Sequence, residues 1–209
     1  MPDRLFTIDE TRDAFTRASQ WWSSLVGAVE PHQWDEPGLD AWTTKELVVH
    51  TDRAFRTLVE YLDGDVKDPT PLASAAAYFR VVLSEANPHV HIAARAQRDA
   101  LDVGDPIDHT DHWSERAATT VALCDGGEMV HTFVGEIRVD QYLATRVIEL
   151  VVHGIDLAEV INIPVSPPPG AARIALAVLT DLVAPDELGV LLRALTGRAQ
   201  LLPGIHVLD

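Results

Sequence analysis

The segment "LATRVIELVVHGIDLAEV", residues 143–160, constrains the fold most strongly because it reads as a helix that is apolar around most of its circumference. Four polar side chains interrupt it: Arg146, Glu149, His153 and Asp156. At about 100° per residue, these four share one stripe about 80° wide. A helix on a protein surface has a broad polar face instead. We therefore expect this helix to be buried, with its polar groups paired with one another or with a metal ion.

Two side chains of this stripe have the spacing of a metal-binding pair. Glu149 and His153 are four residues apart and so are neighbours on one helix face. His50 lies in another helical pattern, "TTKELVVHTDRAFRTLVEYLDG", on the same face as the apolar Leu47 and Ala54. If the two helices pack side by side, His50 joins the pair. Two histidines and one glutamate that leave a coordination position open are typical of catalytic zinc sites.

Other interpretations of these residues remain open at this point. The Glu149–His153 spacing also fits an ordinary intrahelical pair or a core histidine with satisfied hydrogen bonds. Asp156 has the right chemistry to accept a hydrogen bond from a ligand imidazole and orient it. Arg146 has two possible roles, to pair with Glu149 or to hold an anionic group of a substrate. A structural ion pair between Arg146 and Asp156 is an equal alternative.

Composition and charge exclude several classes of partner. The 209 residues carry a net charge of −16, from 32 acidic and 16 basic side chains, which disfavours nucleic acids and anionic membranes as partners. We expect no transmembrane helix, because no long apolar run is present, and no secretion signal at the start of the chain. The single cysteine, Cys124, fits a reducing cytoplasm. One thiol cannot build a cysteine-rich zinc site, so a metal here must use histidine and carboxylate ligands.

The order of sequence patterns predicts a mainly α-helical protein. Helical periodicity runs over residues 7–30, 43–64, 72–101, with a break or kink at Pro88, and 139–160. Thr43 and Glu46 have the spacing of a capping box. β-formers on both sides of Gly126 and Gly127 predict a short hairpin before the last long helix. We expect an up-down four-helix bundle in residues 1–164 and a small helical extension in residues 165–209.

The residues already singled out carry a resemblance to a known family. "WTTKELVVHTDR" and "YLATRVIELVVHGIDLA", with a weaker "LLRALTGRA" near the end of the chain, resemble the DinB-like metal-binding superfamily. More closely, they are similar to the mycothiol-dependent maleylpyruvate isomerase family. The resemblance implies a four-helix bundle in which His50, Glu149 and His153 hold a divalent metal ion, commonly zinc. The spacing argument proposes the same three ligands.

The resemblance also implies an activity. Many members use the thiol mycothiol as a cosubstrate, and a metal-bound thiol is deprotonated to a nucleophilic thiolate near neutral pH. We therefore expect a metalloenzyme that activates such a thiol for transfer to, or isomerisation of, a small electrophile. In that interpretation Arg198, in "LTGRA", is the candidate that binds a substrate carboxylate from the C-terminal extension.

Two alternatives to this function remain. In one, water fills the open coordination position and the protein is a metal-dependent hydrolase of a small molecule. In the other, the bundle is not catalytic and binds a metal ion or a small ligand in the same cavity. In either case the partners are small molecules and not nucleic acid or membrane, and a homodimer remains possible.

Overall fold

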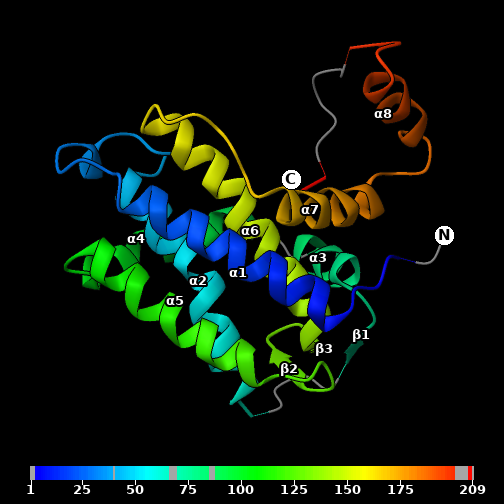
Figure 1. The fold of residues 1–209 in the computed structure, drawn as a ribbon, viewed down its shortest axis with the longest axis horizontal. Helices are drawn as coiled ribbons and strands as arrows, with labels where there is room; N and C mark the ends of the chain where they lie inside the picture. The colour runs from blue at the N-terminus through cyan, green and yellow to red at the C-terminus, as the bar shows by residue number, and fades with distance from the viewer. Residues whose placement is uncertain (1–2, 40, 66–69, 85–87, 201–206, 209) are drawn as a thin grey trace.

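Helices make up most of the protein in the computed structural model, which describes residues 3–39, 41–65, 70–84, 88–200 and 207–208, with backbone alone for 88–93 (Figure 1). The elements in chain order are α1 (Ile8–Val26), a 3₁₀ turn (Gln33–Asp35), α2 (Thr44–Leu62), β1 (Pro71–Leu72), α3 (Ala75–Ser84), α4 (Pro88–Asp102), α5 (Pro106–Leu123), β2 (Met129–Thr132), β3 (Gly135–Arg138), α6 (Val139–Val160), α7 (Pro169–Leu182) and α8 (Leu188–Leu195). The prediction of a mainly α-helical fold is confirmed.

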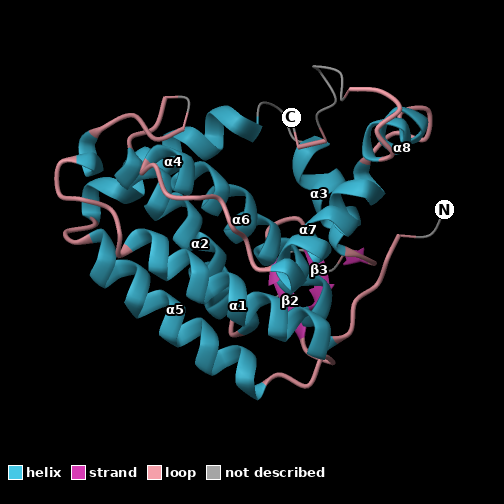
Figure 2. Ribbon diagram, turned by 45° about the horizontal axis from the view of Figure 1, so that its top comes forward, coloured by secondary structure: helices cyan, strands magenta, loops and turns pink. Residues whose placement is uncertain are grey.

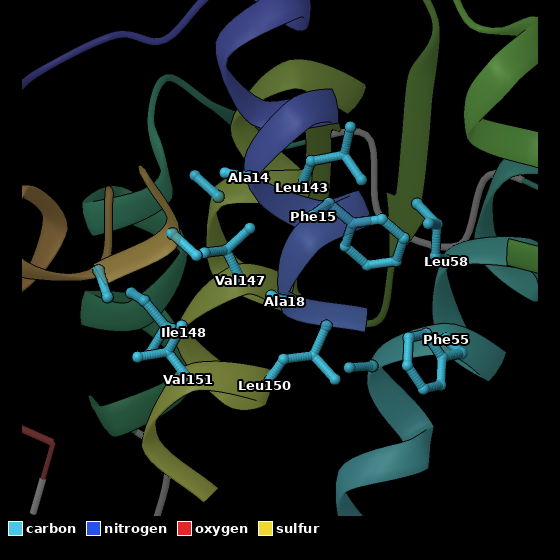
Figure 3. Close-up of a cluster of buried hydrophobic side chains, with 14 of the residues drawn as sticks. Ala14, Phe15, Ala18, Phe55, Leu58, Leu143, Val147, Ile148, Leu150 and Val151 are labelled. Carbon is cyan, nitrogen blue, oxygen red and sulfur yellow. The ribbon is translucent and has the colours of Figure 1, made fainter. Parts of the chain in front are cut away.

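Helix α6 lies at the centre of the molecule, as its apolar circumference predicts. It packs against α1 and α2, and its other contacts are with α3, α7 and the two strands that precede it. Helix α5 closes the arrangement on the other side by packing against both α1 and α2 (Figure 1). Figure 3 shows the shared core, with side chains from three helices in one apolar cluster: Phe15 and Ala18 of α1, Phe55 and Leu58 of α2, and Leu143, Val147 and Leu150 of α6.

Local signals fix where the outer helices begin. Thr7 caps α1 and Thr43 caps α2, and in each case a glutamate three residues later completes a capping box. The capping box at Thr43 is the one that the sequence predicts. Helix α5 begins with Asp105 as its N-cap and proline in its first turn. Helix α6 follows β3 directly, without a side-chain cap.

A three-stranded sheet covers one end of the helices (Figure 2). Strands β2 and β3 form an antiparallel hairpin, and β1 pairs in parallel with β3. Gly135 permits this close approach, because its φ is +145° and a Cβ there would meet the carbonyl oxygen of Thr70 at 2.4 Å. The hairpin lies before α6 as predicted, but the predicted turn is wrong. The chain reverses between Thr132 and Gly135, not at Gly126 and Gly127.

The sequence interpretation also missed α5 and misread its neighbours. The β-formers before Gly126 were expected to be the first strand of the hairpin, yet one helix runs from Pro106 to Leu123. The pattern over residues 72–101 is two helices, α3 and α4, with a strand before them. Acidic and β-branched residues concealed α5, whose apolar residues meet α1 and α2 only in the folded chain.

A buried carboxylate ties α1, α2 and α5 together. Asp52 of α2 is fully buried, and one of its oxygens accepts a hydrogen bond from Trp22 Nε1 at 2.9 Å. The other oxygen accepts one from Thr110 Oγ1 at 2.7 Å and lies 2.9 Å from His109 Nδ1. Burial raises the pKa of Asp52, and these three partners oppose that shift. Every oxygen of this carboxylate therefore has a partner, and the cluster is structural.

The C-terminal helices differ in how they attach. Helix α7 packs against α1, α3 and α6, with Ala171, Ile174 and Val178 buried. Helix α8 lies beyond it at the edge of the molecule and has no buried residue (Figures 1 and 2). In the described part of the chain, no helix is both long and apolar enough to span a membrane.

Helix α6 approaches α1 so closely at one point that only glycine fits. A Cβ built on Gly154 would lie 2.4 Å from Trp21 Cζ3. We expect Gly154→Ala to lower the free energy of unfolding by about 1–3 kcal/mol, because the indole must move or the helices must separate. Urea unfolding monitored by circular dichroism measures the loss.

Gly189 of α8 provides the control for this experiment, because a Cβ there meets nothing within 4 Å. Gly189→Ala should leave stability unchanged or raise it by up to about 1 kcal/mol. Equal stability of the two variants would contradict the close packing of α6 on α1.

Candidate metal centre and adjoining cavity

His50, Glu149 and His153 meet between α2 and α6. We call these three side chains the His–Glu–His cluster. One ligand atom from each lies within 4.8 Å of the other two. Glu149 Oε2 is 4.0 Å from His50 Nε2 and 3.6 Å from His153 Nε2. The packing of α2 against α6 therefore brings together the three residues whose convergence the sequence analysis expected.

The charges of the cluster suit a cation. Burial and the neighbouring His153 lower the pKa of His50 to about 3, so its imidazole is neutral at pH 7. Burial opposes ionisation of Glu149, but His153 and Arg146 outweigh it and lower the Glu149 pKa to about 2. Burial likewise opposes charge on His153, yet Asp156 and Glu149 raise its pKa to about 9. The two carboxylates thus favour positive charge at this point, which a cation site requires.

Different partners hold the two imidazoles. His153 Nδ1 lies 3.0 Å from Asp156 Oδ2, so Nδ1 carries the hydrogen and Nε2 faces Glu149. His50 has an aromatic neighbour instead, since the ring of Trp42 lies 4.6 Å from its ring, centroid to centroid. Trp42 also reaches His153, at 6.4 Å. The contact with Asp156 therefore fixes the orientation of the His153 imidazole.

Arg146 takes none of the ion pairs considered from the sequence. Its guanidinium carbon lies 4.6 Å from the ring centroid of Tyr142 and 5.7 Å from that of Tyr78. Its Nε donates a hydrogen bond to Thr145 Oγ1 at 3.0 Å. Asp156 lies nearly three turns beyond Arg146 on α6 and pairs with His153 instead. The structural Arg–Asp pair is therefore not formed.

A cavity of about 470 Å³ adjoins the His–Glu–His cluster. Its size falls in the range of small-molecule sites. Helices α2, α3, α4 and α6 and the turn between β2 and β3 all contribute to its wall. The lining residues are His50, Arg53, Ala54, Thr57, Tyr61, Tyr78, Phe79, Val82, Arg95, Phe133, Tyr142, Arg146 and Glu149.

Arg198 is not among the residues that line this cavity. It lies exposed in the turn after α8, where its backbone N–H donates to the carbonyl of Arg193. Arg146 and Arg95 instead present positive charge to the cavity. Arg95 and Phe133 were missed in the sequence analysis, because nothing local shows that α4 and the β2–β3 turn face α2. Tyr78 falls in an apolar helical pattern that predicts only burial.

Comparison with known proteins yields one family. The profile of the mycothiol maleylpyruvate isomerase N-terminal domain matches residues 15–158, which is more than half of the chain and includes the whole His–Glu–His cluster. No curated protein and no solved structure matches the chain significantly.

The cluster predicts that metal binding depends on Glu149. Protein purified without a metal-affinity tag should contain about one divalent ion per chain, and Glu149→Ala should contain almost none, because two imidazoles alone hold such an ion weakly. Elemental analysis by mass spectrometry measures the content. Glu136→Ala is the control, since Glu136 pairs with His131 at 2.9 Å without a third ligand. Equal metal content in wild type and Glu149→Ala would contradict the site.

The hydrogen bond at His153 predicts a graded effect. Asp156→Asn should weaken metal affinity about 10–100-fold while the ion still binds, because the imidazole loses its orienting carboxylate. Competition with a chromogenic chelator measures the affinity. Glu159→Gln removes the same charge from an exposed position on α6 and should change affinity less than about twofold. If the two variants weaken metal affinity equally, Asp156 acts only through its negative charge and not by orienting the His153 imidazole.

Proposed function

Because the chain belongs to the mycothiol maleylpyruvate isomerase N-terminal domain family, we propose that it is a metal-dependent enzyme that activates a low-molecular-weight thiol of the mycothiol type. The activated thiol serves to isomerise a small electrophile or is transferred to it. One observation supports this proposal most strongly: His50 of α2 reaches to 4.0 Å from Glu149 of α6 at the edge of a ligand-sized cavity.

The donor set fits a divalent ion, for which zinc is our first candidate. Two imidazoles and one carboxylate are ligands that zinc takes at catalytic sites, with a further position left for an exchangeable ligand. His50 is neutral and Glu149 ionised at pH 7, as ligands must be. His153 would give up its proton to bind, with Asp156 accepting from its other nitrogen. A bound divalent ion would lower the pKa of a coordinated thiol, so that thiolate is present near neutral pH.

The reaction class follows from thiolate chemistry. The sulfur would bond to an electron-poor carbon of a double bond, whose electron pair moves onto a conjugated carbonyl oxygen. Rotation about the new single bond and loss of the same thiolate would give the isomer. Protonation of the neighbouring carbon from solvent would instead leave the thioether, which is the transfer product.

The chain's own residues have defined parts in this proposal. Asp156 and Trp42 hold the two imidazoles in position. Arg146, buried beside Tyr78 and Tyr142, offers positive charge to the oxygen on which negative charge develops. The aromatic walls of the cavity reduce the access of water to the thiolate.

The chain would divide into two parts. Residues 1–164 would form the metal-binding domain, with α1, α2, α5 and α6 as an up-down four-helix bundle, and residues 165–209 the C-terminal extension. A small electrophile and a free thiol would be its partners, and a cytoplasmic location would supply that thiol in reduced form.

Replacement of the native ion by cobalt tests thiol activation directly. If a thiolate enters the coordination sphere, mycothiol should produce an intense sulfur-to-cobalt charge-transfer band in the near ultraviolet. S-methyl mycothiol, which has no ionisable thiol, is the control and should produce none. A cobalt spectrum that mycothiol leaves unchanged would remove the thiol mechanism and favour activation of water, as in a hydrolase.

A further inference from the structure

Arg146 is a buried cation without a close carboxylate. Its residue is 7% exposed. Its Nε donates to Thr145, and no carboxylate oxygen within the described ranges lies within 4.0 Å of its guanidinium. Arg53, which lines the same cavity, contrasts with it, because its Nη1 lies 3.0 Å from Asp99 Oδ2. The cationic end of Arg146 therefore faces the cavity with its charge uncompensated by an ion pair.

Tyr78 and Tyr142 compensate the charge of the Arg146 guanidinium only in part. The faces of Tyr78 and Tyr142 attract the positive charge of the guanidinium. A hydrogen bond from Arg146 also reaches the Tyr78 side chain, but neither tyrosine carries a negative charge. A buried arginine without an ion-pair partner is suited to the two oxygens of a carboxylate. The missing partner at this point of the cavity is thus an anion.

The position of Arg146 places that anion beside the metal centre. Arg146 precedes Glu149 by three residues on α6, so the two side chains are neighbours on one helix face. Both line the cavity, as does His50. A carboxylate held by Arg146 would bring the atoms bonded to it next to the His–Glu–His cluster.

Other parts of the cavity wall are apolar. Phe79 and Val82 of α3 contribute to it, together with Phe133 of the β2–β3 turn. Phe133 is 49% exposed although it is a large apolar side chain. A hydrocarbon or aromatic group in the cavity would cover this ring and gain apolar contact. A small dicarboxylate would leave the same surface uncovered.

We propose that the electrophile of this protein is an amphipathic organic anion, an unsaturated acid whose carboxylate binds Arg146 and whose apolar or aromatic body packs on Phe79, Val82 and Phe133. That this ligand is the substrate rests on the proposed function. That the cavity binds it rests on Arg146 and the apolar wall alone.

Three related probes test the proposal on the full chain stripped of metal, which prevents a carboxylate from binding to the ion instead. trans-Cinnamate has both the carboxylate and the ring, fumarate has a second carboxylate in place of the ring, and cinnamamide has a neutral amide in place of the carboxylate. Isothermal titration should show cinnamate binding at least tenfold more tightly than either of the others. Fumarate or cinnamamide binding as tightly as cinnamate would overturn the proposal.

Variants assign the two parts of the ligand. Arg146→Gln should weaken cinnamate binding roughly 10–100-fold, as expected for loss of a charged hydrogen-bond donor, and leave cinnamamide unchanged. Phe133→Ala should weaken cinnamate about threefold to tenfold and leave fumarate unchanged. Arg17→Gln and Leu123→Ala, which alter exposed side chains outside the cavity, are the matched controls. Cinnamate affinity that both cavity variants leave intact contradicts the proposal.

Two other variants test the same site if Arg146→Gln does not fold. Phe133 lies in an exposed turn, and Arg146→Lys keeps the charge while it removes the two-pronged donor, so it should weaken cinnamate binding but not abolish it. Cinnamate binding without any metal binding would uphold this ligand site and remove the thiol enzyme. Metal and thiol binding without cinnamate binding would do the reverse.

Discussion

The burial of α6 among α1, α2, α3 and α7 leaves its polar stripe with little access to bulk water, so each charge on that stripe must be compensated inside the protein. His153 lies between Glu149 and Asp156, and Arg146 rests on two tyrosine rings. Two of the helices that pack on α6 also deliver groups that meet this stripe: His50 from α2 and Tyr78 from α3. The same helix packing therefore forms the core and brings the site residues together.

Two buried polar clusters share α2, and they differ in how completely they are satisfied. Asp52 has partners from three other side chains on both of its oxygens and lies outside the cavity. Two residues earlier, His50 faces a carboxylate 4.0 Å away, which is too far for a hydrogen bond. A polar cluster in which every donor and acceptor has a partner holds helices together. A cluster whose donors and acceptors remain open toward a cavity can bind a ligand there. This contrast supports a functional reading of His50 and a structural one of Asp52.

The sequence predicted the parts of this protein that depend on local periodicity. The burial of α6 and the capping box of α2 follow from positions three or four residues apart within one helix. The same periodicity places His50 on the inward face of α2, but its approach to Glu149 also depends on how α2 packs against α6. Helix α5 could not be predicted in the same way. Its residue His109 contacts Asp52 across 57 positions of sequence, and only the folded chain makes that contact. The same reason hid Arg95 and Phe133, whose place in the cavity wall is set by tertiary packing alone.

The surface and the cavity of the protein have opposite electrostatic character. The chain carries a net charge of −16, yet three arginines line the cavity. Charges in water are screened within about 8 Å at physiological ionic strength, so the acidic exterior acts weakly on a ligand already inside. In the less polar cavity the field of Arg146 is stronger at equal distance. The acidic exterior would slow the association of an anion, and the arginines inside would slow its dissociation. Selectivity of the proposed site would therefore lie in the dissociation rate of the ligand and not in its association rate.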